Sequence, residues 1–151
     1  MPRLLAIVFL LSGWLPTLAS AHDTDFAFGS PGRAAEVTRT IHVVADDTMR
    51  LHFDATDLRE GDVVRFEVRN TGRLAHEFGI ADAAGQREHA QMMRQMPDMA
   101  HDDPNVITLK PGQTRSLIWK FTHMRQHRLV FACNVPGHYE AGMFLRLTVK
   151  K

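Results

Sequence analysis

The chain has 151 residues, of which 44% are hydrophobic and 23% are charged, and its formal net charge is +1. Such a chain forms one globular domain or a small pair, and its composition excludes a disordered protein, a basic field for nucleic acid and an acidic tail. It contains nine His, eight Met and one Cys. One Cys excludes an internal disulfide and any site that needs two thiolates from the same chain.

The first 21 residues are expected to be a secretory signal peptide. Residues 1–3 give a positive start, residues 4–15 are largely apolar, and Ala19-Ser20-Ala21 is an A-x-A cleavage signal. The apolar run is too short to span a bilayer, so we expect a periplasmic protein with no membrane anchor after cleavage. Residues 22–37 carry Gly, Pro and charge with little periodicity, and we interpret them as a flexible leader to a domain of residues 38–151.

Alternating apolar residues predict short strands along this domain, with turn signals at residues 60–62, 70–72 and 110–113. Strands at this spacing predict an all-β fold, an antiparallel sandwich with Greek-key connections. The residues expected to face inward are Ile41, Val43 and Ala45; Met49, Leu51 and Phe53; Val64, Phe66 and Val68; His76, Phe78 and Ile80; Leu117, Trp119 and Phe121; Leu129, Phe131 and Cys133; and Met143, Leu145, Leu147 and Val149.

Residues 85–101 interrupt the strand pattern. Polar residues with good helix propensity run from Gln86 to Met96, and Pro97 ends them, so we expect a short helix or an ordered loop inserted between two strands. The segment gathers imidazole and thioether side chains: His89, Met92, Met93, Met96, Met99 and His101. On a helix, three of them share one face, because they are spaced three and four residues apart: His89, Met92 and Met96.

Two interpretations of this Met- and His-containing segment stay open. Thioethers and imidazoles together form a soft pocket for Cu(I), which makes the segment a candidate auxiliary site for a second copper. Alternatively, the Met residues face the core or form a flexible apolar contact surface. No Leu, Ile or Val occurs between Gln86 and Asp103, which disfavours an ordinary core helix.

The C-terminal segment places three metal-ligating residue types at one end of the predicted sandwich. Cys133 ends one inward-facing row, Met143 begins the next, and His138 lies in the loop between them. Pro136-Gly137 turns the chain before His138, and Gly142 permits tight geometry before Met143. One loop can therefore direct a thiolate, an imidazole and a thioether to the same point.

A fourth ligand must come from another strand. His76 is the best candidate, because it follows the turn at residues 70–72 and faces inward. Two His and one Cys with a weak axial Met form a type 1 copper site, in which copper alternates between Cu(II) and Cu(I). Zinc fits less well, because a thioether is a poor zinc ligand. Each residue taken singly has an ordinary alternative as a small buried thiol, core filler or interior histidine.

The segment from Cys133 to Met143 resembles the copper loop of the cupredoxin family, and its C-x4-H-x4-M spacing is closer to that of rusticyanin than to that of plastocyanin. Residues 70–78 are similar to the N-x-G-x-x-x-H-E-F segment of periplasmic cupredoxin-like copper proteins. The resemblance covers roughly residues 38–151. It implies that one type 1 copper is bound by His76, Cys133, His138 and Met143, with Glu77 beside the first His where many blue copper proteins have Asn.

The Met- and His-containing segment also resembles stretches of cupredoxins linked to bacterial copper tolerance. This implies an exported copper protein of periplasmic copper tolerance, with an electron carrier between redox partners as the alternative. The expected partners are copper ions and periplasmic redox or copper-handling proteins. We expect no enzyme, because the chain lacks the H-x-H pairs of multicopper oxidases and the second His of an H-E-x-x-H zinc site.

Overall fold

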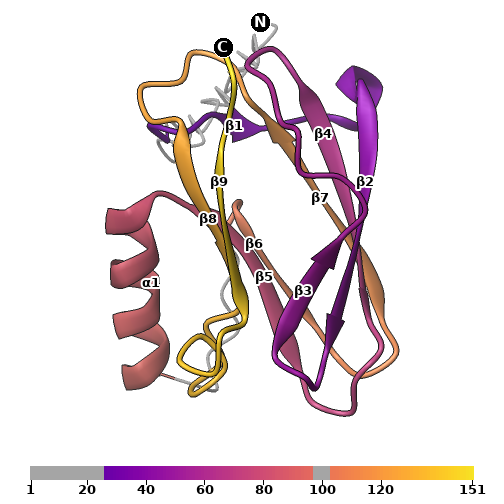
Figure 1. The fold of residues 1–151 in the computed structure, drawn as a ribbon, viewed down its shortest axis with the longest axis vertical. Coiled ribbons are helices and arrows are strands. Elements are labelled where there is room, and N and C mark those ends of the chain that lie inside the picture. The colour runs from indigo at the N-terminus through magenta and orange to yellow at the C-terminus, as the bar shows by residue number, and fades with distance from the viewer. Residues whose placement is uncertain (1–25, 97–102) are drawn as a thin grey trace, which may run out of the picture.

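A computed structural model describes residues 26–96 and 103–151. The predicted signal peptide, residues 1–21, and two members of the Met- and His-containing segment, Met99 and His101, lie outside the described residues. Two β-sheets face each other, and one helix lies alongside the second sheet (Figure 1). In the described ranges, no helix has the length and apolar character needed to cross a membrane.

The first sheet has the strand order β1-β7-β4-β2-β3. Its strands are β1 Ser30–Pro31, β2 Arg39–Asp46, β3 Arg50–Phe53, β4 Val63–Asn70 and β7 Thr114–Lys120. In β4, Val64, Phe66 and Val68 are fully buried and the side chains between them are more exposed, as the two-residue period of a strand requires. The alternation in the sequence therefore identified the buried face correctly.

One pairing in this sheet corrects the prediction of an antiparallel sandwich. β2 and β4 run parallel, with Ile41 opposite Phe66 and Ala45 opposite Asn70. Alternation within a strand determines which face is buried, but it carries no information on the direction of the neighbouring strand. Because the two strands are parallel, both end at the same edge of the sheet, and this edge carries the candidate site.

The second sheet has the strand order β6-β5-β8-β9, and all its pairs are antiparallel. Its strands are β5 His76–Ala81, β6 Val106–Leu109, β8 Arg128–Ala132 and β9 Phe144–Thr148. All six residues of β5 are buried. The inner face of β5 contacts the first sheet, and helix α1, Ala83–Gln95, covers its other face together with that of β8 (Figure 1).

Helix α1 begins directly after β5. The carboxylate of Asp82 accepts the backbone N–H groups of Ala84 and Gly85, which is the usual way to cap a helix start. The helix ends at Gln95, ahead of Pro97. The predicted all-β sandwich with a short helical insertion is confirmed, although the helix begins earlier than the polar pattern indicated.

Aromatic side chains fill the space between the two sheets. The ring centroid of Phe66, from the first sheet, lies 5.5 Å from that of Phe78 and 5.4 Å from that of Phe131, which both belong to the second sheet. All three rings are fully buried. Close packing of this kind holds the two sheets at a fixed separation, so side chains at the sandwich end are placed on a rigid support.

The prediction of a flexible leader is wrong for residues 26–37. The rings of Phe26 and Phe28 lie 5.2 and 5.4 Å from the ring of Trp119. β1 pairs with β7, and a short 3-10 helix, Ala34–Glu36, follows. Two aromatic side chains bury enough apolar surface to fix a segment that is too short to show periodicity.

Candidate metal centre

His76 is the first residue of β5, and its side chain is fully buried. The chain reaches it through the turn after β4, where Asn70 forms an internal support. The Asn70 side-chain amide donates to the carbonyl of Leu74 at 2.7 Å, and its oxygen accepts the backbone N–H of Gly72 at 2.9 Å. The buried Asn at the start of the N-x-G motif thus fixes the path of the backbone toward His76.

Backbone hydrogen bonds close the loop from Cys133 to Met143. The N–H of Cys133 donates to the carbonyl of Met143 at 3.1 Å, and the N–H of Met143 donates to the carbonyl of His138 at 3.0 Å. Gly137 and Gly142 adopt φ values of 88° and 101°, in the left-handed region that favours glycine. The predicted roles of these turn residues are confirmed, and the loop folds back on itself.

The structure brings together His76, Cys133 and His138, whose ligand atoms all lie within 4.8 Å of one another. The Nδ1 atoms of the two imidazoles are 3.2 Å apart, and Cys133 Sγ lies 3.4 Å from His138 Nδ1. His76 and Cys133 are fully buried, and His138 retains 9% exposure. Met143 is also fully buried, and its backbone bonds join it to both Cys133 and His138.

The chemistry of these donors fits copper. Burial raises the pKa of the Cys133 thiol to about 12, so the metal-free protein holds a protonated thiol, and a metal ion that binds the sulfur must displace its proton. Burial and the neighbouring His76 lower the pKa of His138, which keeps its imidazole neutral and its lone pair available. Two imidazoles and a thiolate, with the buried Met143 joined to the same loop by backbone bonds, make a donor set of mixed hardness, which suits both copper oxidation states.

Asp47, which the sequence analysis missed, supports His76 from the opposite side of the ring. Its Oδ1 atom lies 3.3 Å from His76 Nε2. A proton held on Nε2 by this contact leaves the lone pair on Nδ1, the atom that faces Cys133 and His138. The carboxylate also accepts the backbone N–H groups of Arg73 and Leu74, and these bonds lower the pKa of Asp47.

The position of Asp47 depends on the parallel pairing of β2 with β4. Asp47 directly follows β2, and the turn after β4 ends at the same edge of the sheet. A Cβ atom on Gly72 would lie 2.0 Å from Asp47 Oδ1, so only glycine allows the carboxylate to come this close. The signal in the sequence was the turn at Asp46-Asp47, but its relation to His76 required knowledge of the strand order.

Glu77 lies beside the cluster, where the resemblance placed it. Its backbone N–H donates to Cys133 Sγ at 3.2 Å. Its side chain is buried and extends toward helix α1, where Glu77 Oε2 lies 3.3 Å from His89 Nε2. The contact joins the helix to the strand that carries His76.

The helix distributes its other metal-ligating residue types over different environments. Met93 is 3% exposed, whereas Met96, just after the helix, is 39% exposed. Met92 is half-buried, and His89 contacts Glu77. The described residues of the candidate auxiliary site therefore lie in different environments, and Met93 is buried. A second copper in this segment stays a prediction.

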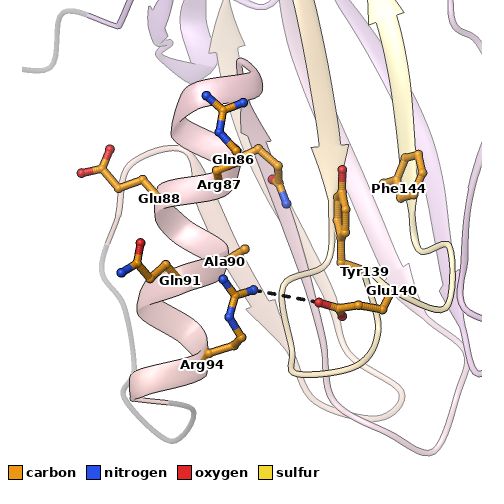
Figure 2. Close-up of a pocket in the computed structure, with 9 residues that line it drawn as sticks. All are labelled: Gln86, Arg87, Glu88, Ala90, Gln91, Arg94, Tyr139, Glu140 and Phe144. Atoms are coloured by element: carbon orange, nitrogen blue, oxygen red, sulfur yellow. Dashed lines mark ion pairs between the residues drawn. The ribbon is translucent and has the colours of Figure 1, made fainter.

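A groove of about 870 Å³ runs between helix α1 and the loop that follows His138 (Figure 2). Arg94 and Glu140 face each other across it at 4.0 Å, and the ring of Tyr139 stacks on that of Phe144 at 4.7 Å. Besides its contact with β5 through Glu77, the helix therefore also lies close to the loop that follows His138. Its lining residues are Gln86, Arg87, Glu88, Ala90, Gln91, Arg94, Tyr139, Glu140 and Phe144.

Comparison with curated proteins finds relatives at substantial identity. The copper-resistant cuproprotein CopI of Rubrivivax gelatinosus is 43% identical over 132 residues, which cover 87% of this chain and 79% of the relative. The protein of the same name from Vibrio cholerae serotype O1 is 44% identical over 117 residues, covering 76% of this chain and 68% of the relative. No family model matches the chain.

Solved structures of similar fold include the auracyanins. Auracyanin B matches with a TM-score of 0.62 and 23% identity, covering 82% of this chain and 96% of that chain. The auracyanin of Roseiflexus castenholzii matches with a TM-score of 0.57 and 21% identity, covering 76% of this chain and 99% of that chain. At these identities the likeness concerns the fold alone, and it matches the two-sheet sandwich described above.

Proposed function

Because the chain belongs to the CopI family of copper-resistant cuproproteins and has the cupredoxin fold, we propose that it binds copper at a type 1 site and serves copper resistance. The proposed ligands are His76, Cys133, His138 and Met143. The observation that carries the proposal is the convergence of the buried Cys133 thiol with two imidazole Nδ1 atoms. Copper bound there would supply a redox-active Cu(II)/Cu(I) centre.

The proposed ligands are held by three parts of the fold. Asp47 orients His76, the backbone N–H of Glu77 donates to Cys133, and the loop bonds hold His138 and Met143. Preorganised ligands bind a metal without a further loss of conformational entropy, which favours retention of copper. We place the protein in the periplasm, as the A-x-A signal before residue 22 suggests.

A second candidate function is electron transfer between periplasmic redox partners. The surroundings of His138 favour it, because this ligand retains 9% exposure and its loop neighbours Pro136 and Ala141 are exposed. A small apolar surface at a ligand edge is suited to transient docking of a partner. Neither function requires catalytic turnover, and the absence of enzyme activity stays a prediction.

The first test is a Cu(II) titration of the purified protein, read by visible absorption. We expect an intense thiolate-to-copper band that saturates at one copper, and we expect the variant Cys133→Ser to lack it. Met96→Leu is the matched control, because Met96 is exposed and outside the cluster. If the wild-type protein shows faint bands and no intense band, the four-residue site is wrong. Saturation at two coppers would support an additional site in helix α1.

The second test separates the two candidate functions. A strain that lacks the protein is complemented with the wild type or with Cys133→Ser, and growth is measured against copper concentration. We expect only the wild type to restore growth. Full restoration by Cys133→Ser would contradict a resistance role for this site and would leave electron transfer as the better candidate.

A further inference from the structure

Two candidate ligands, one at the start of β5 and one directly after β8, are each followed by a residue that is joined to helix α1. Glu77 follows His76, and its carboxylate lies 3.3 Å from His89 Nε2. Asn134 follows Cys133, and its side-chain amide exchanges two hydrogen bonds with that of Gln86, at 2.5 and 3.3 Å. The helix therefore contacts the ligand-bearing backbone at two separate points.

Both contacts are buried. Gln86 is 6% exposed, Asn134 is 5% exposed and Glu77 is 2% exposed. Buried amides and carboxylates need hydrogen-bonding partners, so each side chain restricts the position of the other. In the Gln86–Asn134 pair, the amide nitrogen of each residue donates to the amide oxygen of the other, and this arrangement tolerates little displacement.

Attachment of the helix does not depend on these polar pairs alone. The helix contacts β5 and β8, and Met93, one turn after His89, is 3% exposed, so apolar burial also stabilises the helix. Apolar side chains at positions 86 and 89 would also bury surface, but they would not fix the orientation of the helix on the sheet. The polar pairs thus add orientation to a helix that packing already holds.

From this geometry we infer that Gln86 and His89 are positioning residues for the copper site, an inference that rests on the proposed function. His89 holds Glu77, whose backbone N–H donates to Cys133 Sγ at 3.2 Å. Gln86 holds Asn134 and thereby the backbone next to the same sulfur. With copper bound, the helix would act on the thiolate through Glu77, because hydrogen bonds to the Cys sulfur set the electronic properties of such a centre, and through the backbone position of Cys133 beside Asn134.

The inference assigns His89 a role other than that of a copper ligand. Its Nε2 atom faces Glu77, and its Nδ1 atom lies 3.8 Å from a carboxylate oxygen of Asp103. The ring is flanked by carboxylates on both sides and is only 12% exposed. This orientation suits a residue that supports a neighbouring site.

The test compares Gln86→Leu and His89→Leu with Gln95→Leu in the copper-loaded full-length protein. Gln95 is an exposed glutamine of the same helix and is the matched control. For the first two variants we expect a changed ratio of the charge-transfer bands, a shifted reduction potential and a copper affinity lower by about 10- to 100-fold. For Gln95→Leu we expect wild-type values. His89→Gln keeps a donor for Glu77 and should restore part of the spectrum.

A merely structural role of the helix gives a different result. If Gln86→Leu and His89→Leu lower the melting temperature but keep the spectrum, the potential and the copper affinity of the wild type, the inference is wrong. If a leucine variant does not fold, Gln86→Met or His89→Met replaces it, with the same readouts deciding. If the wild type itself shows no thiolate-to-copper band, the proposed function fails, which is a distinct outcome.

Discussion

The loop from Cys133 to Met143 and helix α1 are both rich in metal-ligating residue types, yet the fold uses them differently. In the loop, backbone hydrogen bonds and two left-handed glycines direct Cys133 and His138 toward His76. In the helix, His89 contacts Glu77 and Met93 is buried, and Met96, just after the helix, is exposed. Nearness in sequence therefore does not make a site; the backbone must also direct the side chains to one point.

The largest expected effect is the loss of the copper absorption band, which a variant of the loop should cause and a variant of the helix segment should not. His138→Ala should abolish the intense thiolate-to-copper band, because it removes one of the two imidazoles at the sulfur. The helix double variant Met92→Ala with Met96→Ala should keep the band. Both are measured by visible absorption at one equivalent of Cu(II). Loss of the band in the helix variant alone would reverse the comparison.

Stability should separate two methionines of this segment, Met93 inside the helix and Met96 just after its end. Met93→Ala should lower the free energy of unfolding by about 2–5 kcal/mol, because it leaves a cavity beneath the helix. Met96→Ala should change it by less than about 0.5 kcal/mol, since that side chain is exposed. Urea denaturation of the metal-free protein measures both. Equal effects would argue against a core-facing Met93.

A smaller effect is expected from the support behind His76. Asp47→Ala should lower copper affinity by about 10- to 100-fold, because the His76 ring loses the acceptor that orients it. Asp57→Ala is the control, since Asp57 is exposed and pairs with Arg39 away from the cluster. Competition with a chelator of known affinity gives the measurement. Unchanged affinity in Asp47→Ala would remove Asp47 from the site.

The last prediction concerns the change in copper affinity per pH unit. With a pKa of about 12, the Cys133 thiol is protonated in the metal-free protein, so copper binding must release this proton. His138, whose pKa is lowered, is already neutral near pH 7 and releases none. Copper affinity should therefore rise about tenfold per pH unit from pH 7 to 9, with one proton released per copper. A thioether site on the helix has no proton to lose and would show no such slope.

The strands and the loop were predictable because their signals are local. Alternation located β4 and β8, and the spacing from Cys133 to Met143 with its turn residues predicted one closed loop. The β5 strand also followed from alternation of His76, Phe78 and Ile80. The burial of both faces of β5 could not be predicted from alternation, because it depends on where helix α1 packs.

The missed features all depend on contacts between distant parts of the chain. The parallel pairing of β2 with β4 brings Asp47 to His76, and no local pattern encodes the direction of a neighbouring strand. The pairs of Gln86 with Asn134 and His89 with Glu77 likewise depend on the docking of the helix. Fixation of residues 26–37 results from aromatic contacts with Trp119, more than 90 residues away.

The complete burial of Cys133 affects how readily its thiol is oxidised in the metal-free protein. Thiol–disulfide exchange requires a thiolate that another sulfur can approach in line, and its rate falls when either the thiolate fraction or access is small. Cys133 is fully buried and has a pKa of about 12, so both factors are small. The metal-free chain is therefore protected from mixed disulfides even in an oxidising compartment, and its one thiol stays reduced until the metal arrives.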